Sequence, residues 1–67
     1  MTMKELSING TEATATVDDV NLAAAVAANL VQGGAEFSQQ TTVDETGVCE
    51  WTFRFPRKAV PLLSGIL

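Results

Sequence analysis

The stretch that most constrains the fold of this 67-residue chain is DDVNLAAAVAANLVQGG, residues 18–34. Two aspartates precede the apolar run, where a carboxylate accepts hydrogen bonds from free backbone N–H groups and suits the positive end of a helix dipole. Alanine, leucine and valine dominate residues 20–32 and together favour a helix. Gly33 and Gly34 then end it, because glycine readily adopts the left-handed conformation found just past many helices. The sequence therefore predicts a helix over residues 20–32.

This helix is apolar around most of its circumference. Its polar side chains fall on one narrow stripe at helical spacing, formed by Asn21, Asn29 and Gln32. The remaining apolar arc is wider than a helix lying on a single sheet needs, so we expect the helix to touch more than one neighbour. The part of this arc that has no assigned partner in a sheet comprises Leu22, Val26 and Leu30.

Two strand-like segments precede the helix, at residues 4–8 and 11–17. Asn9-Gly10 lies between them and predicts a hairpin with a type I′ turn, in which both central residues need positive φ. In the second segment apolar residues alternate with polar ones, which indicates a strand with one dry face. The predicted dry face consists of Ala13, Ala15 and Val17.

Two further strand-like segments follow the helix. Residues 35–43 are rich in Thr and Val but polar in the middle, which is typical of an edge strand. Residues 44–47, DETG, form a predicted turn. Residues 48–55 are the strongest strand of the chain, and we expect this strand to be central. Its apolar face carries most of the bulk available to a core, from Cys49, Trp51, Phe53 and Phe55.

The C-terminal segment, residues 57–67, predicts either a short helix or an extended tail. A helix there would place Pro61 in its first turn, where the missing N–H is not needed. Its aliphatic residues need a partner surface, from the same chain or from a second one. The stripe they form comprises Val60, Leu63, Ile66 and Leu67.

Length and composition indicate one small domain, residues 1–67. A core this small is marginal, and one cysteine with no histidine excludes an internal disulfide and the usual zinc spacing. The net charge of −4 disfavours binding to nucleic acid. No apolar run reaches the length of a membrane span, and the N-terminus lacks the apolar core of a signal peptide, so we expect no membrane partner and a cytoplasmic location.

The order hairpin, helix, hairpin predicts an α+β fold, ββαββ, with a four-stranded sheet crossed by one helix and an optional short C-terminal helix. With the first and last strands central and parallel, this is the β-grasp arrangement. Residues 4–55 then resemble, in the pattern of elements, the small immunoglobulin-binding domains of streptococcal protein G and protein L. No motif for immunoglobulin binding accompanies that pattern. The main alternative is a ββα unit whose second hairpin pairs with a second copy of the chain.

Candidate chemical sites are few. Cys49 shares its face with Trp51, has no histidine to activate it, and is therefore expected in the core. The carboxylates of Asp44, Glu45 and Glu50 lack the ligand number and spacing of a calcium loop. We therefore expect no catalytic residue, no metal site and no cofactor, and the chain is not expected to be an enzyme.

The hypothesis that remains is a small acidic, non-enzymatic protein–protein interaction module that forms a homodimer and regulates or inhibits a host protein. The alternative is a ubiquitin-like carrier of the β-grasp type, although the sequence ends in SGIL and not in the Gly-Gly that such a carrier uses. The small size favours a bacterial or phage origin. The candidate interface residues are Leu22, Val26, Leu30, Val60, Leu63, Ile66 and Leu67.

Overall fold

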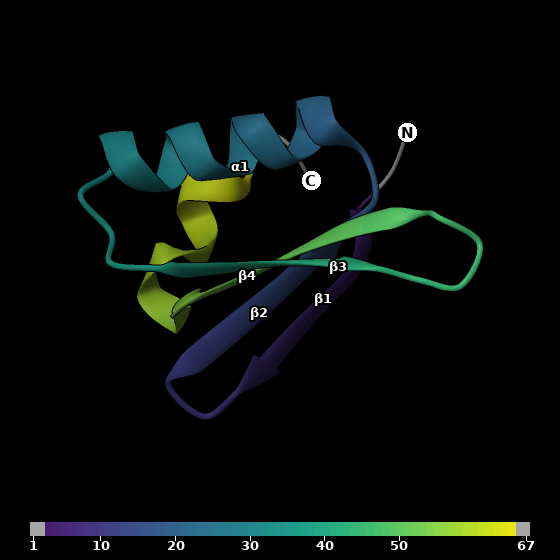
Figure 1. Ribbon diagram of the computed structural model, residues 1–67. Coiled ribbons are helices and arrows are strands. Elements are labelled where there is room, and N and C mark those ends of the chain that lie inside the picture. Colours follow the sequence, from purple (N-terminus) through teal and green to yellow (C-terminus); the bar gives the residue numbers. More distant parts are fainter. Residues whose placement is uncertain (1–2, 66–67) are drawn as a thin grey trace.

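The computed structural model describes residues 3–65 and has two layers, a four-stranded sheet and a helical layer on one of its faces (Figure 1). The elements in chain order are β1 (Met3–Asn9), β2 (Glu12–Val17), helix α1 (Val20–Gln32), β3 (Ser38–Val43), β4 (Cys49–Pro56) and the 3-10 helix η1 (Arg57–Leu63). The α+β class and the helix bounds predicted from the sequence are confirmed. We call the sheet face that carries α1 and η1 the inner face.

The strand order is β1-β2-β4-β3, and each neighbouring pair is antiparallel. The expected β-grasp arrangement is not confirmed, because β2 and not the first strand lies beside β4. The physical reason is visible in the burial of the two candidate strands. The inner residues of β2 are fully buried, whereas Leu6 and Ile8 of β1 keep 37% and 48% of their surface exposed. β1 also has a shift in register between Met3 and Glu5, an irregularity typical of an edge strand.

The turn between β1 and β2 differs from the prediction in type. Asn9 pairs with Glu12, so the two turn residues are Gly10 and Thr11. Gly10 has φ of +66°, and no non-glycine residue between positions 3 and 65 has positive φ. A positive φ at the first turn residue alone fits a type II′ turn and not type I′. The hairpin is therefore confirmed, but the glycine occupies the first central position and not the second.

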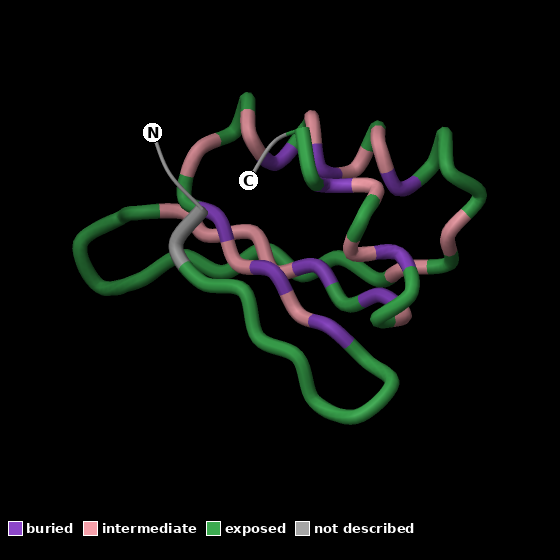
Figure 2. Tube along the Cα trace, turned by 180° about the vertical axis from the view of Figure 1, so that it is seen from behind, coloured by how far each residue is buried: buried purple, intermediate pink, exposed green. Residues whose placement is uncertain are grey.

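The core is built on size matching between the two central strands. Ala13 lies opposite Phe55 and Ala15 lies opposite Phe53, so each phenylalanine of β4 has a small neighbour on β2. Because the alanines are short, α1 can approach the sheet closely enough to bury one side of its surface. That side consists of Ala23, Val26 and Leu30, and the buried residues of β2, β4 and α1 face one another between the two layers (Figure 2).

Both ends of α1 follow the sequence signals closely. Asp19 is the N-cap, and its carboxylate accepts a hydrogen bond from the backbone N–H of Leu22 at 3.0 Å. At the C-terminal end Gly33 still has helical φ of −80°, and the left-handed residue is Gly34, at +71°. The chain then turns back toward the sheet and enters β3.

The C-terminal segment packs on its own chain as far as it is described. Residues 57–63 form η1, with Pro61 inside it and not in its first turn. Seven residues is long for a 3-10 helix, and the missing Pro61 N–H removes one of its internal hydrogen bonds. Asn29 of α1 donates from Nδ2 to the carbonyl oxygen of Leu62 at 3.0 Å. Ile66 and Leu67 lie outside the described residues.

Gly33 explains how closely α1 and η1 approach each other. A Cβ atom placed on Gly33 would lie 2.4 Å from Cδ1 of Leu62. The glycine therefore provides the space that Leu62 occupies, in addition to ending the helix. The helix contacts two neighbours, the sheet and η1, as the width of its apolar arc predicted, although Val20 and Val31 stay exposed.

Replacing Phe53 with alanine tests the aromatic part of the core. Phe53 is fully buried, so Phe53→Ala should lower the free energy of unfolding by about 3–5 kcal/mol through lost burial and a cavity. Val31→Ala removes an aliphatic side chain that is 64% exposed, and should change stability by less than about 0.5 kcal/mol. Urea unfolding followed by circular dichroism measures both, and equal effects would contradict this core.

Replacing Asn29 with alanine tests the attachment of η1. Asn29→Ala leaves the Leu62 carbonyl without its side-chain donor and should lower the free energy of unfolding by about 1 kcal/mol. Asn21→Ala is the matched control, because Asn21 is an exposed asparagine on the same helix. Thermal unfolding of the two variants should separate them, and an Asn29→Ala variant as stable as Asn21→Ala would show that this hydrogen bond contributes nothing.

Candidate functional site

The residues that the sequence indicated as an interface are divided by the structure. Val26, Leu30 and Leu63 are fully buried within the chain's own core. Leu22 and Val60 are half-buried and pack against the same core. Packing of α1, η1 and the sheet within one chain, one of the alternatives that the sequence left open, accounts for their apolar character. Val26, Leu30 and Leu63 are therefore not available to a partner, whereas Leu22 and Val60 keep part of their surface exposed.

Cys49 begins β4, half-buried, opposite Val43 of β3. It lies on the inner face, as predicted, but at the edge of the core and not within it. No hydrogen bond or ion pair of its thiol is observed among residues 3–65, so the arrangement around it gives no means of activating a nucleophile.

The acidic turn between β3 and β4 is organised around one carboxylate. Oδ1 of Asp44 accepts hydrogen bonds from the backbone N–H and the hydroxyl of Thr46, at 2.8 and 2.6 Å, and from the backbone N–H of Val48 at 3.0 Å. Gly47 completes the turn with φ of +86°. The predicted turn at residues 44–47 is confirmed. This carboxylate shapes a hairpin, and no group of three or more acidic or cysteine side chains within residues 3–65 is arranged to hold a metal ion.

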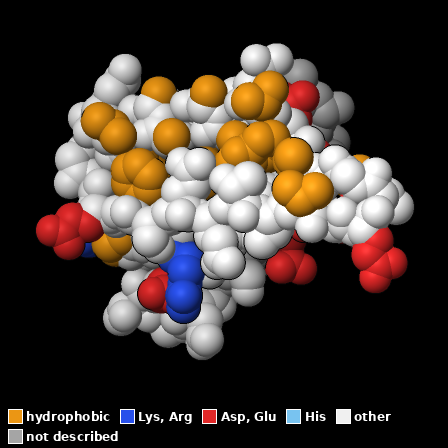
Figure 3. All heavy atoms as spheres, viewed as in Figure 1, with side chains coloured by type: hydrophobic (Ala, Val, Ile, Leu, Met, Phe, Trp, Pro, Cys, Tyr) orange, Lys and Arg blue, Asp and Glu red, His pale blue; other side chains and the backbone are white. Residues whose placement is uncertain are grey.

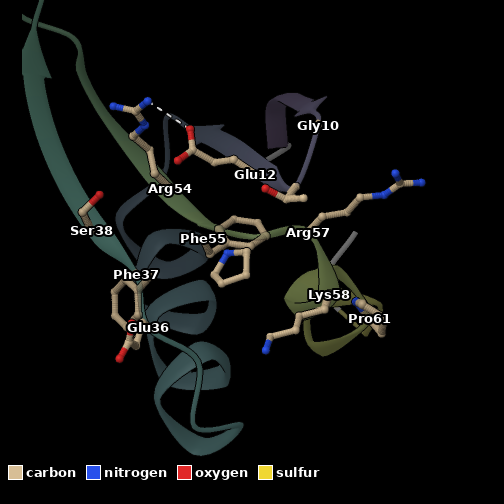
Figure 4. A pocket seen from close by; sticks show the side chains of 12 residues that line it. Gly10, Glu12, Glu36, Phe37, Ser38, Arg54, Phe55, Arg57, Lys58 and Pro61 are labelled. Atoms are coloured by element: carbon tan, nitrogen blue, oxygen red, sulfur yellow. Dashed lines mark hydrogen bonds and ion pairs between the residues drawn. The ribbon is translucent and has the colours of Figure 1, made fainter.

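An open groove of about 1100 Å³ lies at the end of the sheet where β4 leads into η1. Glu36 and Phe37 form one wall and Lys58 and Pro61 the other, while Phe55 lies between them (Figure 4). The three cations Arg54, Arg57 and Lys58 also line it, as they cluster in the sequence.

The charges of this groove are largely balanced. Arg54 donates to Glu12 at 3.0 Å, both side chains being more than half exposed, and such an exposed pair is worth little. The guanidinium group of Arg57 extends away from Phe55 (Figure 4). Two of the twelve lining residues are glutamates, which offset two of the three positive charges. The groove therefore has no strong preference for an anion.

The surface most accessible to a partner is the part of the inner face that β3 forms. α1 packs over β2 and β4, so the inner side chains of β3 are exposed. Val43 keeps 62% of its surface exposed there, and Phe37, just before β3, is half-buried against Phe53 with ring centroids 6.2 Å apart. Figure 3 shows hydrophobic side chains gathered between α1 and β3 on this side of the molecule. We call this region, residues 37–43, the β3 flank.

The free edge of β3 borders the β3 flank. β3 pairs with β4 on one side, in a register without irregularity, and no described strand pairs with its other side. All six of its residues are exposed, and none of them is charged or proline. Sequence reasoning identified this segment as an edge strand, and the structure confirms that position. What the sequence did not reveal is that the adjacent inner face lacks a covering helix.

The same chain was compared with protein-family models, with curated proteins and with solved structures, and no match was found in any of the three. The resemblance to immunoglobulin-binding domains therefore has no support beyond the order of elements. No helix within residues 3–65 is long and apolar enough to cross a membrane.

Replacing Asp44 with alanine tests the turn that orients the β3–β4 hairpin. Asp44→Ala removes an acceptor shared by three donors and should lower the free energy of unfolding by about 1 kcal/mol. Glu45→Ala is the control, because no hydrogen bond of this neighbouring carboxylate is observed in the described part of the chain, and it should change stability by less than about 0.5 kcal/mol. A smaller loss for Asp44→Ala than for Glu45→Ala, in urea unfolding, would contradict the role assigned to Asp44.

Proposed function

We propose that this protein is a small, non-enzymatic protein–protein interaction module that associates with itself. The observation that carries the proposal is the β3 flank, where an uncharged strand edge adjoins exposed apolar side chains. Unpaired backbone groups along a strand edge, next to apolar surface, are satisfied by another polypeptide chain. A symmetric pair of copies is the commonest way in which proteins cover such a surface.

Two features support an interaction role over a catalytic one. Exposed apolar side chains lie on both edge strands, at Leu6 and Ile8 of β1 and at Val43 of β3, and also on α1, so the chain has more apolar surface than its own packing covers. Within residues 3–65 the titratable side chains do not converge on a shared cavity with a nucleophile and a base. The charge of −4 keeps most of the remaining surface hydrophilic.

Sedimentation equilibrium tests the proposal directly. The expected mass is about twice the 7.1 kDa of a single chain, with dissociation at low concentration. Because association stabilises the folded state, the midpoint of thermal unfolding should also rise with protein concentration. A mass of one chain at the highest concentration reached, together with a concentration-independent midpoint, would contradict self-association.

A further inference from the structure

The two edges of the sheet differ in how well they are protected against pairing. β1 has a register irregularity after Met3 and the charged Glu5 within it. Both features are devices by which natural edge strands avoid pairing with other chains. β3 has neither, since it pairs regularly along its whole length and its sequence, SQQTTV, is uncharged. The unprotected edge is therefore β3.

We infer that β3 pairs antiparallel with β3 of a second copy, around a two-fold axis that passes midway between Gln40 of one copy and Gln40 of the other. This inference rests on the proposed self-association and names the surface that performs it. Residues directly opposite each other in an antiparallel pair lie on the same face of the sheet. With Gln40 opposite its own copy, Gln39 lies opposite Thr41, Ser38 opposite Thr42, and Phe37 opposite Val43.

This register is favoured because the strand is complementary to itself. Its two apolar residues on the inner face are at opposite ends, Phe37 before the strand and Val43 at its last position, and both keep exposed surface. Antiparallel self-pairing brings one end of β3 against the other end of its copy, so each Phe37 meets a Val43, twice in the dimer. Aromatic and β-branched side chains form a favourable cross-strand pair.

The neighbouring register, centred on Thr41, lacks this complementarity. It places Val43 opposite Gln39 and Phe37 opposite Glu45, so the two apolar residues no longer face each other. A shift by a single residue is excluded as well, because it would put inner-face residues of one copy opposite outer-face residues of the other. The inner-face pairing of Phe37 with Val43 therefore selects the axis at Gln40.

The charge distribution is compatible with a second copy as the partner at this edge. Two chains of net charge −4 repel each other, and the repulsion is least where they meet through uncharged strands. The acidic residues nearest to β3 are Glu36 and Asp44, which flank it and come opposite each other in this register. Because their repulsion is exposed and screened by ions, the dimer should become tighter as salt concentration rises.

The helical layers leave room for this pairing. α1 packs over β2 and β4, and β3 extends beyond it at the front of the molecule (Figure 1). With the two-fold axis normal to the sheet, both helical layers lie on the same face, separated by the two β3 strands. The paired β3 flanks then form the floor between them, covering Val43 of each copy with Phe37 of the other.

A charge exchange at Gln40 tests the inference. In this register Gln40→Lys places two lysines directly opposite each other, and Gln40→Glu places two glutamates there. Each variant alone should therefore dimerise about fivefold more weakly than the natural chain, which corresponds to about 1 kcal/mol for a cross-strand pair. Mixing the two variants places lysine opposite glutamate and should restore dimerisation. Sedimentation equilibrium of each variant and of the mixture gives the constants, and circular dichroism verifies the fold.

Two controls separate this surface and register from others. Ser7→Lys adds the same charge to an exposed residue of β1, the other edge strand, and should leave the dimer almost as tight as before. Thr41→Lys adds the same charge to the adjacent residue of β3. The register centred on Thr41 predicts that this variant weakens the dimer more than Gln40→Lys does. A dimer that Gln40→Lys does not weaken, a mixture that is not restored, or a larger loss for Thr41→Lys than for Gln40→Lys would each overturn the inference. In each case self-association, through another surface or in another register, would stand, whereas a monomeric natural chain would contradict the proposed function itself.

Discussion

The pairing of β2 with β4 is the interaction on which the rest of this structure depends. It places the alanines of one strand beside the phenylalanines of the other, so that a flat area of small side chains adjoins the largest side chains of the core. Without the alanines, α1 would be held away from the sheet. Without the phenylalanines, a chain of this length would have too little apolar bulk to fold. The antiparallel contact between the two central strands meets both requirements.

The position of η1 follows from this arrangement and determines what remains exposed. η1 fills the angle between the end of α1 and the end of the sheet, where Gly33 makes room for Leu62 and Asn29 bonds to its carbonyl group. The helical layer is consequently concentrated over β2 and β4. The inner faces of β1 and β3 are covered less than those of the central strands, so both edge strands keep apolar side chains exposed, as α1 does at Val20 and Val31.

The sequence predicted the edge strand of the candidate site, but not where on the molecule an interface would lie. The polar middle of residues 35–43 indicated an edge strand, and it is one. The interface, however, was expected around Val26, Leu30 and Leu63, because apolar residues with no evident partner suggest an external one. The structure places all three in the core. Their partner is η1 and the sheet of the same chain, an alternative that the sequence left open, because a contact between segments about thirty residues apart cannot be chosen from a local pattern.

The sequence by itself determined the local structure of this protein. Helix bounds, the N-cap at Asp19, both hairpins and the alternation of faces on β2 and β4 depend on neighbouring residues, whose spacing is visible in the chain. Tertiary structure decided which hairpin strand joins β4, how α1 and η1 share a core, and which edge stays open. These outcomes depend on burial summed over the whole molecule. β2 is central because its inner side chains are small enough to lie beneath a helix, whereas the inner side chains of β1 stay partly exposed.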